Sequence, residues 1–167
     1  MPDQTEVNFS LTGLEDLKHS LKTKKNVKIG VLGDAGKRES KMDENGNQEK
    51  NSMTNAEIGA VHEFGSFSGD IPKRSFLKAS FFEKKEAFLK QMAGIVDRDI
   101  GKNNGIEKIY SSMALIGAGI VQQAFHTSGF GKWAPLSPKT IEKKKSASIL
   151  IDSGQLRKSI TYRIDDE

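Results

Sequence analysis

The chain has 167 residues, of which 26 are basic and 22 acidic, giving a formal net charge of +4. That length favours a single domain over residues 1–167, and so small a charge excess does not by itself indicate a nucleic-acid-binding protein. The absence of cysteine excludes disulfides, thiolate catalysis and cysteine-ligated metals. No apolar run reaches the roughly 18 residues of a membrane span, and the polar, acidic N-terminus does not match a signal peptide.

The N-terminal part of the chain predicts two strands with a helix between them. Apolar residues alternate with polar ones at 7–11 and again at 27–32, which indicates strands with one buried and one solvated face. Between them, the leucines of residues 14–21 have the spacing of an amphipathic helix.

A polar segment follows the second strand. Residues 34–51 contain almost no apolar side chain and cannot bury enough surface to offset the entropy lost on ordering, so we expect a mobile loop at about 34–53. Gly30, Gly33 and Gly36 have a spacing seen in dinucleotide-binding turns. No amphipathic helix follows them to present its N-terminus to a pyrophosphate, so we interpret them as a turn.

The middle of the chain predicts a helix, a corner and two long helices. Thr54 begins the first helix, with Glu57 as its capping-box partner. The helix ends at Gly65, and Pro72 restricts the preceding residue to an extended conformation. Apolar stripes then predict helices at about 75–100 and 106–126, paired antiparallel or with one packed across the sheet.

The second long helix carries glycines in its interior, notably Gly117 and Gly119. Each such glycine costs about 1 kcal/mol relative to alanine, so we expect another backbone to pack closely against this helix.

Short elements complete the chain. Ser137 predicts the start of a short helix that continues into residues 143–145, and Asp152 or Ser153 predicts the cap of a helical turn through Leu156. The alternation at 160–164 predicts a last strand. The order of elements predicts an α+β domain. We expect a small, mostly antiparallel sheet packed on one face by two long helices, with a long mobile polar loop.

No catalytic, metal or cofactor-binding motif is present, so we expect no enzyme activity and no cofactor. His19, His62 and His126 lack the spacing of a metal site, and neither a nucleophile elbow nor a phosphate-binding loop occurs. An enzyme using Glu57, His62 and Glu63 would need a pocket in which these groups converge.

The corner between the first of these helices and the next combines aromatic and basic residues. This mixture suits stacking on nucleic acid, but aromatic residues and arginine are also enriched in protein interfaces, and we favour the interface. The candidate interface residues are Phe64, Phe67, Lys73, Arg74 and Phe76.

Two pairs of segments resemble one known family. N-A-E-I-G-A-V-H-E-F-G at 55–65 is followed by I-P-K-R-S-F-L-K-A-S at 71–80, and W-A-P-L-S-P-K-T-I-E-K-K-K at 133–145 by L-I-D-S-G-Q-L-R-K-S-I-T-Y-R-I at 150–164. The chain is similar in these motifs and in their order to the tailed-phage virion morphogenesis proteins, which include tail-completion and neck proteins. The resemblance extends from about residue 27 to the end, except for the polar loop.

The resemblance implies a non-enzymatic structural protein of the virion, assembled in the host bacterial cytoplasm. Such a protein forms a homo-oligomeric ring, often a hexamer, at the head-proximal end of the tail or in the neck. Its implied partners are a head-completion or connector protein, a tail terminator or tail tube protein, and phage DNA contacted non-specifically in the lumen, with no membrane. We expect the corner to supply one patch of the ring interface and the polar loop or an edge strand the other.

Two alternatives remain open, namely a tail terminator that caps the tail tube and a small basic nucleic-acid-binding protein. The motif positions that the resemblance assigns to the fold are Glu63, Gly65, Pro72, Trp133, Pro135, Leu136, Asp152, Ser153, Gly154 and Leu156.

Overall fold

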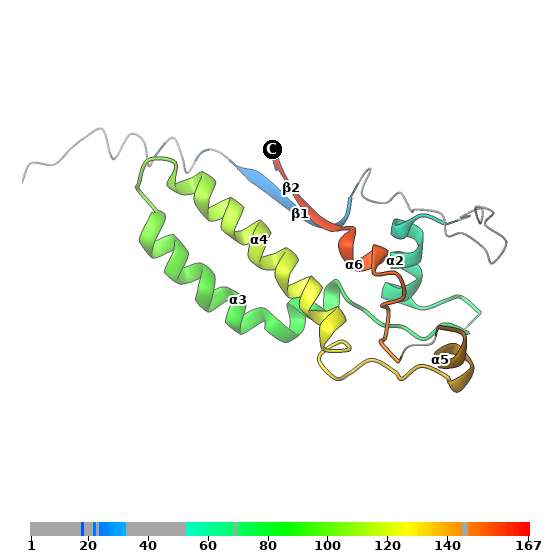
Figure 1. The fold of residues 1–167 in the computed structure, drawn as a ribbon. Coiled ribbons are helices and arrows are strands. Elements are labelled where there is room, and N and C mark those ends of the chain that lie inside the picture. Colours follow the sequence, from blue (N-terminus) through cyan, green and yellow to red (C-terminus); the bar gives the residue numbers. More distant parts are fainter. Residues whose placement is uncertain (1–17, 19–21, 23, 33–52, 69, 145–146) are drawn as a thin grey trace, which may run out of the picture.

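A computed structural model describes residues 18, 22, 24–32, 53–68, 70–144 and 147–167. The strand predicted at 7–11, nearly all of the helix predicted at 14–21 and nearly all of the polar loop lie outside these residues. The described part is an α+β fold in which a helical hairpin and a two-stranded sheet lie towards one end and three short helices towards the other (Figure 1).

The sheet consists of β1 (Lys25–Val31) and β2 (Ile160–Asp166), which pair antiparallel (Figure 1). The register sets Ile29 opposite Tyr162 and Val31 opposite Ile160. Because side chains alternate between the faces of a strand, the apolar positions of both strands share one face. Helix α4 (Gly105–His126) packs against this face through contacts with both strands.

The two long helices stack in layers rather than side by side on the sheet. Helix α3 (Lys78–Asp99) runs antiparallel to α4 and packs mainly against it, so α4 lies between α3 and the sheet (Figure 1). The α+β class, both long helices and their antiparallel pairing are confirmed, and the expected packing of two helices on one face of the sheet holds only roughly, because α3 packs mainly on α4. The chain reverses between them through Gly101 and Asn104, which have positive φ angles of 78° and 55°.

The glycines within α4 have different surroundings. A Cβ atom at Gly117 would overlap the end of the Ile29 side chain and lie 3.2 Å from Phe81 Cζ, whereas one at Gly119 would meet nothing within 4 Å among the described residues. The expected close approach is therefore made by side chains from β1 and α3 at Gly117, and not by another backbone.

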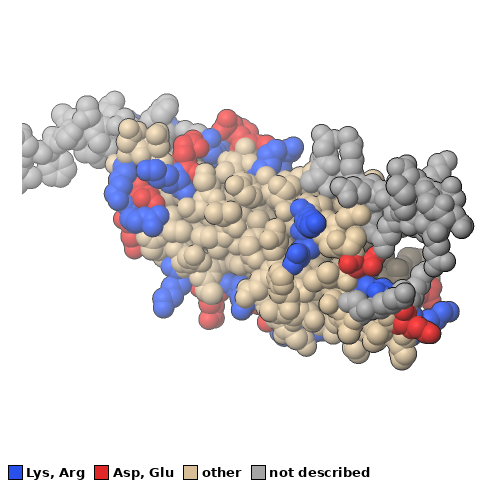
Figure 2. Space-filling view, viewed as in Figure 1, with Lys and Arg blue, Asp and Glu red and all other residues tan. Residues whose placement is uncertain are grey.

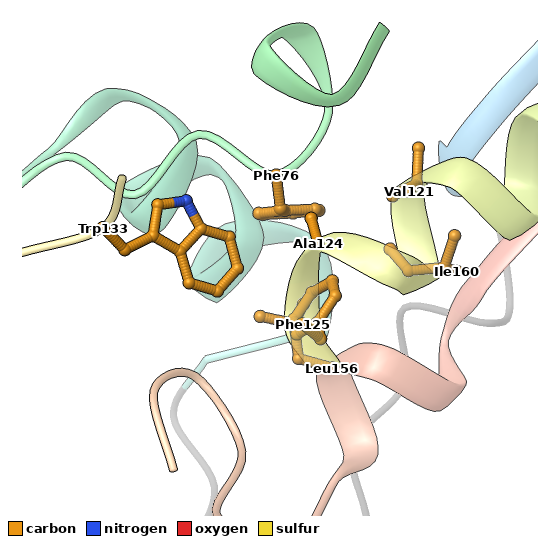
Figure 3. Packing of buried hydrophobic residues seen from close by; sticks show 7 residues of the cluster. All are labelled: Phe76, Val121, Ala124, Phe125, Trp133, Leu156 and Ile160. Carbon is orange, nitrogen blue, oxygen red and sulfur yellow. The ribbon is translucent and has the colours of Figure 1, made fainter. Parts of the chain in front are cut away.

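The main core cluster gathers at the C-terminal end of α4. Phe76 and Val121 are fully buried, and the Phe125 ring contacts those of Phe76 and Trp133, with ring centroids 5.1 and 5.8 Å away (Figure 3). Leu156 from α6 (Gln155–Lys158) completes this side of the cluster. Side chains from four separate stretches of the chain therefore meet here, and burying each large apolar side chain contributes about 1.5–3 kcal/mol.

The short helices test the predicted caps. In α2 (Asn55–Phe64) the capping box of Thr54 and Glu57 is confirmed, with backbone-to-side-chain hydrogen bonds of 2.7 and 3.2 Å. In α5 (Pro138–Lys144) the Thr140 N–H donates to Ser137 Oγ at 3.2 Å, which confirms the Ser137 cap. For α6 the predicted cap position is wrong, because Gly154, with φ of 76°, occupies the N-cap position in place of Asp152 or Ser153.

Charged side chains of both signs are interspersed on the face of the molecule shown in Figure 2, and no continuous basic surface forms there. No helix in the described part of the chain has the length and apolarity required to span a membrane.

Gly117→Leu should lower the free energy of unfolding by about 1–3 kcal/mol or more, because the new side chain overpacks the site between Ile29 and Phe81. The matched change Gly119→Leu, two residues along the same helix in open space, should raise stability by up to about 1 kcal/mol. Urea denaturation of both variants measures the difference. Equal effects would contradict the packing described.

Candidate interaction site

The last turn of α2 supplies the cap for α3. The first N–H groups of an α-helix have no partner within the helix, and Leu77 at the N-cap position of α3 makes no side-chain capping bond. Glu63, which is 5% exposed, fills this role. Its carboxylate accepts hydrogen bonds from the N–H groups of Phe76, Leu77 and Lys78 at 2.8, 2.9 and 3.0 Å, and from Ser75 Oγ at 2.6 Å.

These bonds keep Glu63 ionised. Burial acts to raise the pKa of this carboxyl, but the donors from Leu77, Ser75, Lys78 and Phe76 together outweigh burial and hold the pKa below 4.5. A carboxylate at this position also interacts favourably with the positive end of the α3 dipole. Glu63 therefore fixes the angle between α2 and α3 with a buried negative charge.

Arg74 and Trp133 join the two motif-bearing regions of the chain. Arg74 donates from Nε to the Ala134 carbonyl oxygen at 3.0 Å and from Nη2 to the Pro135 carbonyl oxygen at 3.2 Å. In the opposite direction, Trp133 Nε1 donates to the Ser75 carbonyl oxygen at 3.1 Å. Segments that lie far apart in the sequence thus form one packed unit.

Residues 64–73, the elbow, form the first part of the connection from α2 to α3, and residue 69 of this segment is outside the described part. Gly65 has φ of 88°, a conformation that favours glycine. The Ser66 N–H donates to the Ile71 carbonyl oxygen at 3.0 Å, and the Ile71 N–H donates to Ser66 Oγ at 2.9 Å. The turn leaves Phe67 fully exposed.

Three of the five predicted interface residues lie on the surface of the elbow. Phe64 is 76% exposed, and Phe67 and Lys73 are also exposed. Arg74 and Phe76 are 5% and 0% exposed, so neither lies on the outer surface of the elbow.

The physical reason lies in contacts with distant parts of the chain. Arg74 hydrogen-bonds to the carbonyl oxygens of Ala134 and Pro135. Phe76 packs into the core cluster, whereas Lys73 stays exposed. These partners lie far along the chain, so local sequence did not separate the buried residues from the exposed one. The sequence also contained no sign that Glu63 would cap α3, because its partners lie 12 to 15 positions further along the chain.

The motif positions assigned to the fold have two kinds of surroundings, and some positions have both. Glu63, Trp133, Gly154 and Leu156 are buried, and Gly65 shapes the elbow. Several of the ten line a common cleft, and these are Pro72, Pro135, Leu136, Asp152, Ser153, Gly154 and Leu156.

This cleft has a volume of about 450 Å³ and lies between α2, the end of the elbow, the segment before α5 and the start of α6. Its lining is partly apolar, with Ile58, Leu136 and Leu150 among the contributing side chains. Arg74 and His62 also line it. No prediction from the sequence identified a cleft, because its walls come from four separate stretches of the chain.

His62 is neutral at physiological pH. Its Nδ1 atom is buried without a hydrogen-bond partner among the described residues. Burial, followed by the positive charges of Arg74 and Lys144, lowers the pKa of His62 to about 4.

The candidate metal-binding and acid–base residues are not brought together within the described part of the chain. The described residues contain no group of three histidine, cysteine or acidic side chains that could hold a metal ion. His126 contacts Arg157 Nη1 at 2.8 Å, and His19 is outside the described residues. The carboxylates of Glu57 and Glu63 are both engaged in helix capping, so they do not form an acid–base set with His62.

Against these features, comparison with known proteins adds no relative: no family model, curated protein or solved structure matches the chain.

Replacing Glu63 with Gln should lower the free energy of unfolding by about 3 kcal/mol, because the amide removes the charge and sets an NH₂ group against backbone N–H donors. Glu57→Gln, on the same helix but at the exposed capping box, is the matched control and should have a clearly smaller effect. Chemical denaturation at pH 7 measures both. Similar losses would contradict the role of Glu63.

Protonation of His62 should lower the free energy of unfolding as the pH falls. Its pKa is about 4 in the folded chain against an ordinary value of 6.5, so the unfolded chain binds a proton first as the pH falls from 6.5 towards 4. Denaturation between pH 7 and 5, above the range of most carboxyl groups, should show this slope. His62→Gln should reduce it, and an unchanged slope would show that His62 is not responsible.

Proposed function

We propose that this chain is a structural protein of a tailed phage or prophage virion. It forms a ring at the head-proximal end of the tail or in the neck, completes the tail and joins it to the capsid connector. The observation that carries this proposal is the convergence of the motif segments. Arg74 and Trp133 hydrogen-bond across the two regions in which the chain resembles virion morphogenesis proteins.

That convergence gives the motif pattern a physical meaning. Trp133 and Leu156 from the second region enter the same core cluster as Phe76 from the first. The motifs then belong together because they form one folding unit, and not because each carries a separate activity. This supports a shared fold with the family that the motifs resemble.

A closed ring needs two different patches on each subunit. The elbow supplies the first, with Phe64 and Phe67 exposed beside Lys73. An outer edge of the sheet supplies the second, because the described residues leave one edge of β1 and one of β2 without a neighbouring strand.

Among the alternatives, a tail terminator differs only in which joint the ring occupies. A nucleic-acid-binding role has less support, because burial of Arg74 and Phe76 removes an arginine and an aromatic ring from the surface of the corner. The remaining exposed side chains, two of them large and apolar, suit a protein interface. Contact with phage DNA in the lumen stays part of the proposal as a non-specific interaction.

Phe64→Ser combined with Phe67→Ser should abolish ring formation while changing the unfolding free energy by less than about 0.5 kcal/mol per site. Light scattering on the purified protein, alone and with tail tubes, measures assembly. Leu115→Ser is the matched control, because Leu115 is 64% exposed on α4, away from the elbow. Loss of assembly in the control as well, or in neither variant, would contradict the elbow interface.

The location of the protein in the virion tests the proposal that it is a structural protein of the tail or neck. Labelling of purified virions for electron microscopy should place it at the head–tail junction, and deletion should yield heads and tails that fail to join. Absence from particles with no tail defect would overturn the proposal. Tight binding of the monomer to DNA, with a steep dependence on salt, would favour the nucleic-acid alternative.

A further inference from the structure

The cleft contains an arginine that forms no ion pair with the described residues. The Arg74 side chain is 5% exposed and lines the cleft, and its hydrogen bonds reach only the carbonyl oxygens of Ala134 and Pro135. Its Nη1 has no hydrogen-bond partner within the described part of the chain, and no carboxylate there forms an ion pair with it.

A buried guanidinium in this state is unusual. Buried charges are normally paired, because removing an ion from water costs several kcal/mol and carbonyl oxygens satisfy donors without neutralising charge. Lys144 on the cleft wall adds positive charge. Burial lowers the pKa of Arg74 from its ordinary value, which indicates the same unfavourable desolvation of the charged form.

The shape and lining of the cleft limit what can bind. A volume of about 450 Å³ lies within the range of about 300–1,000 Å³ that is usual for pockets holding small groups. Asp70 and Asp152 also line the cleft, so a ligand with several negative charges is disfavoured and one with a single negative charge beside Arg74 fits better. Ile58, Leu136 and Leu156 offer apolar contacts beside Arg74.

We propose that this cleft docks an acidic segment of a partner protein, in which one Asp or Glu carboxylate pairs with the free side of the Arg74 guanidinium. The planar fork of arginine suits a carboxylate. Apolar side chains next to that carboxylate occupy the part of the cleft lined by Leu136 and Leu156. This docking is separate from the elbow interface and does not depend on the virion assignment.

Nuclear magnetic resonance of the full chain tests the proposal with acetyl-Leu-Glu-Leu amide as the probe. The peptide should shift the Arg74 Nε–H signal and the His62 ring signals. The control peptide acetyl-Leu-Gln-Leu amide should bind with an affinity at least about tenfold lower, because it lacks the charge. Equal affinity of the two peptides would overturn the pairing with Arg74. Absence of any shift would overturn the site.

Two further titrations distinguish a carboxylate ligand from a phosphate ligand. Inorganic phosphate and a short oligothymidylate should leave the Arg74 and His62 signals unchanged at concentrations where the Glu peptide is bound. Stronger binding of either one than of the Glu peptide would overturn the assignment to an acidic protein segment and indicate a phosphate site.

Because Arg74 also supports the fold, the variants are placed at Ser153, an exposed residue on the cleft wall. Ser153→Glu should weaken binding of the Glu peptide about fivefold through charge repulsion, while Ser153→Gln, nearly the same size and neutral, should have no such effect. Equal affinities in the two variants would overturn the proposal. The measurement uses the chain without a tail partner, so its outcome is independent of ring assembly.

Discussion

The buried Glu63 carboxylate is the constraint on which this end of the molecule depends. One side chain at the end of α2 accepts four hydrogen bonds from residues at the start of α3, and burial makes each of them costly to lose. Neither helix can tilt relative to the other without leaving a charge or a backbone N–H unpaired. The elbow between them is therefore fixed in position at both ends. Its exposed aromatic side chains project from a rigid segment for this reason.

The path of the chain after the elbow follows from this restraint. In the segment 71–76, Arg74 and Phe76 are buried and Lys73 is exposed. Phe76 joins the cluster around Phe125 and Trp133, while Arg74 reaches the carbonyl groups that follow Trp133. Phe64 and Phe67 are exposed and are not among the residues that line the cleft, so the two proposed interactions use different side chains.

Glu63 and Arg74 are both buried and charged, but the described residues satisfy them to different extents. Glu63 is fully satisfied within the chain, and its charge serves the fold. Arg74 is satisfied in part, because carbonyl oxygens take two of its donors and leave the charge without a counterion among the described residues. The difference between the two groups is the physical basis for assigning one to stability and the other to binding.

The sequence by itself determined the elements whose signals are local. Periodicity located both long helices and the strands at 25–31 and 160–166 to within a few residues, and Thr54 with Glu57 marked the start of α2, because caps and amphipathic stripes depend on neighbours within one or two turns. Only the tertiary structure decided the stacking of α3 on α4, the burial of Arg74 and Phe76, and the cleft beside His62. Each of these depends on contacts between residues far apart in the chain, and composition and spacing carry no information on which distant partner satisfies a given charge or fills a given space.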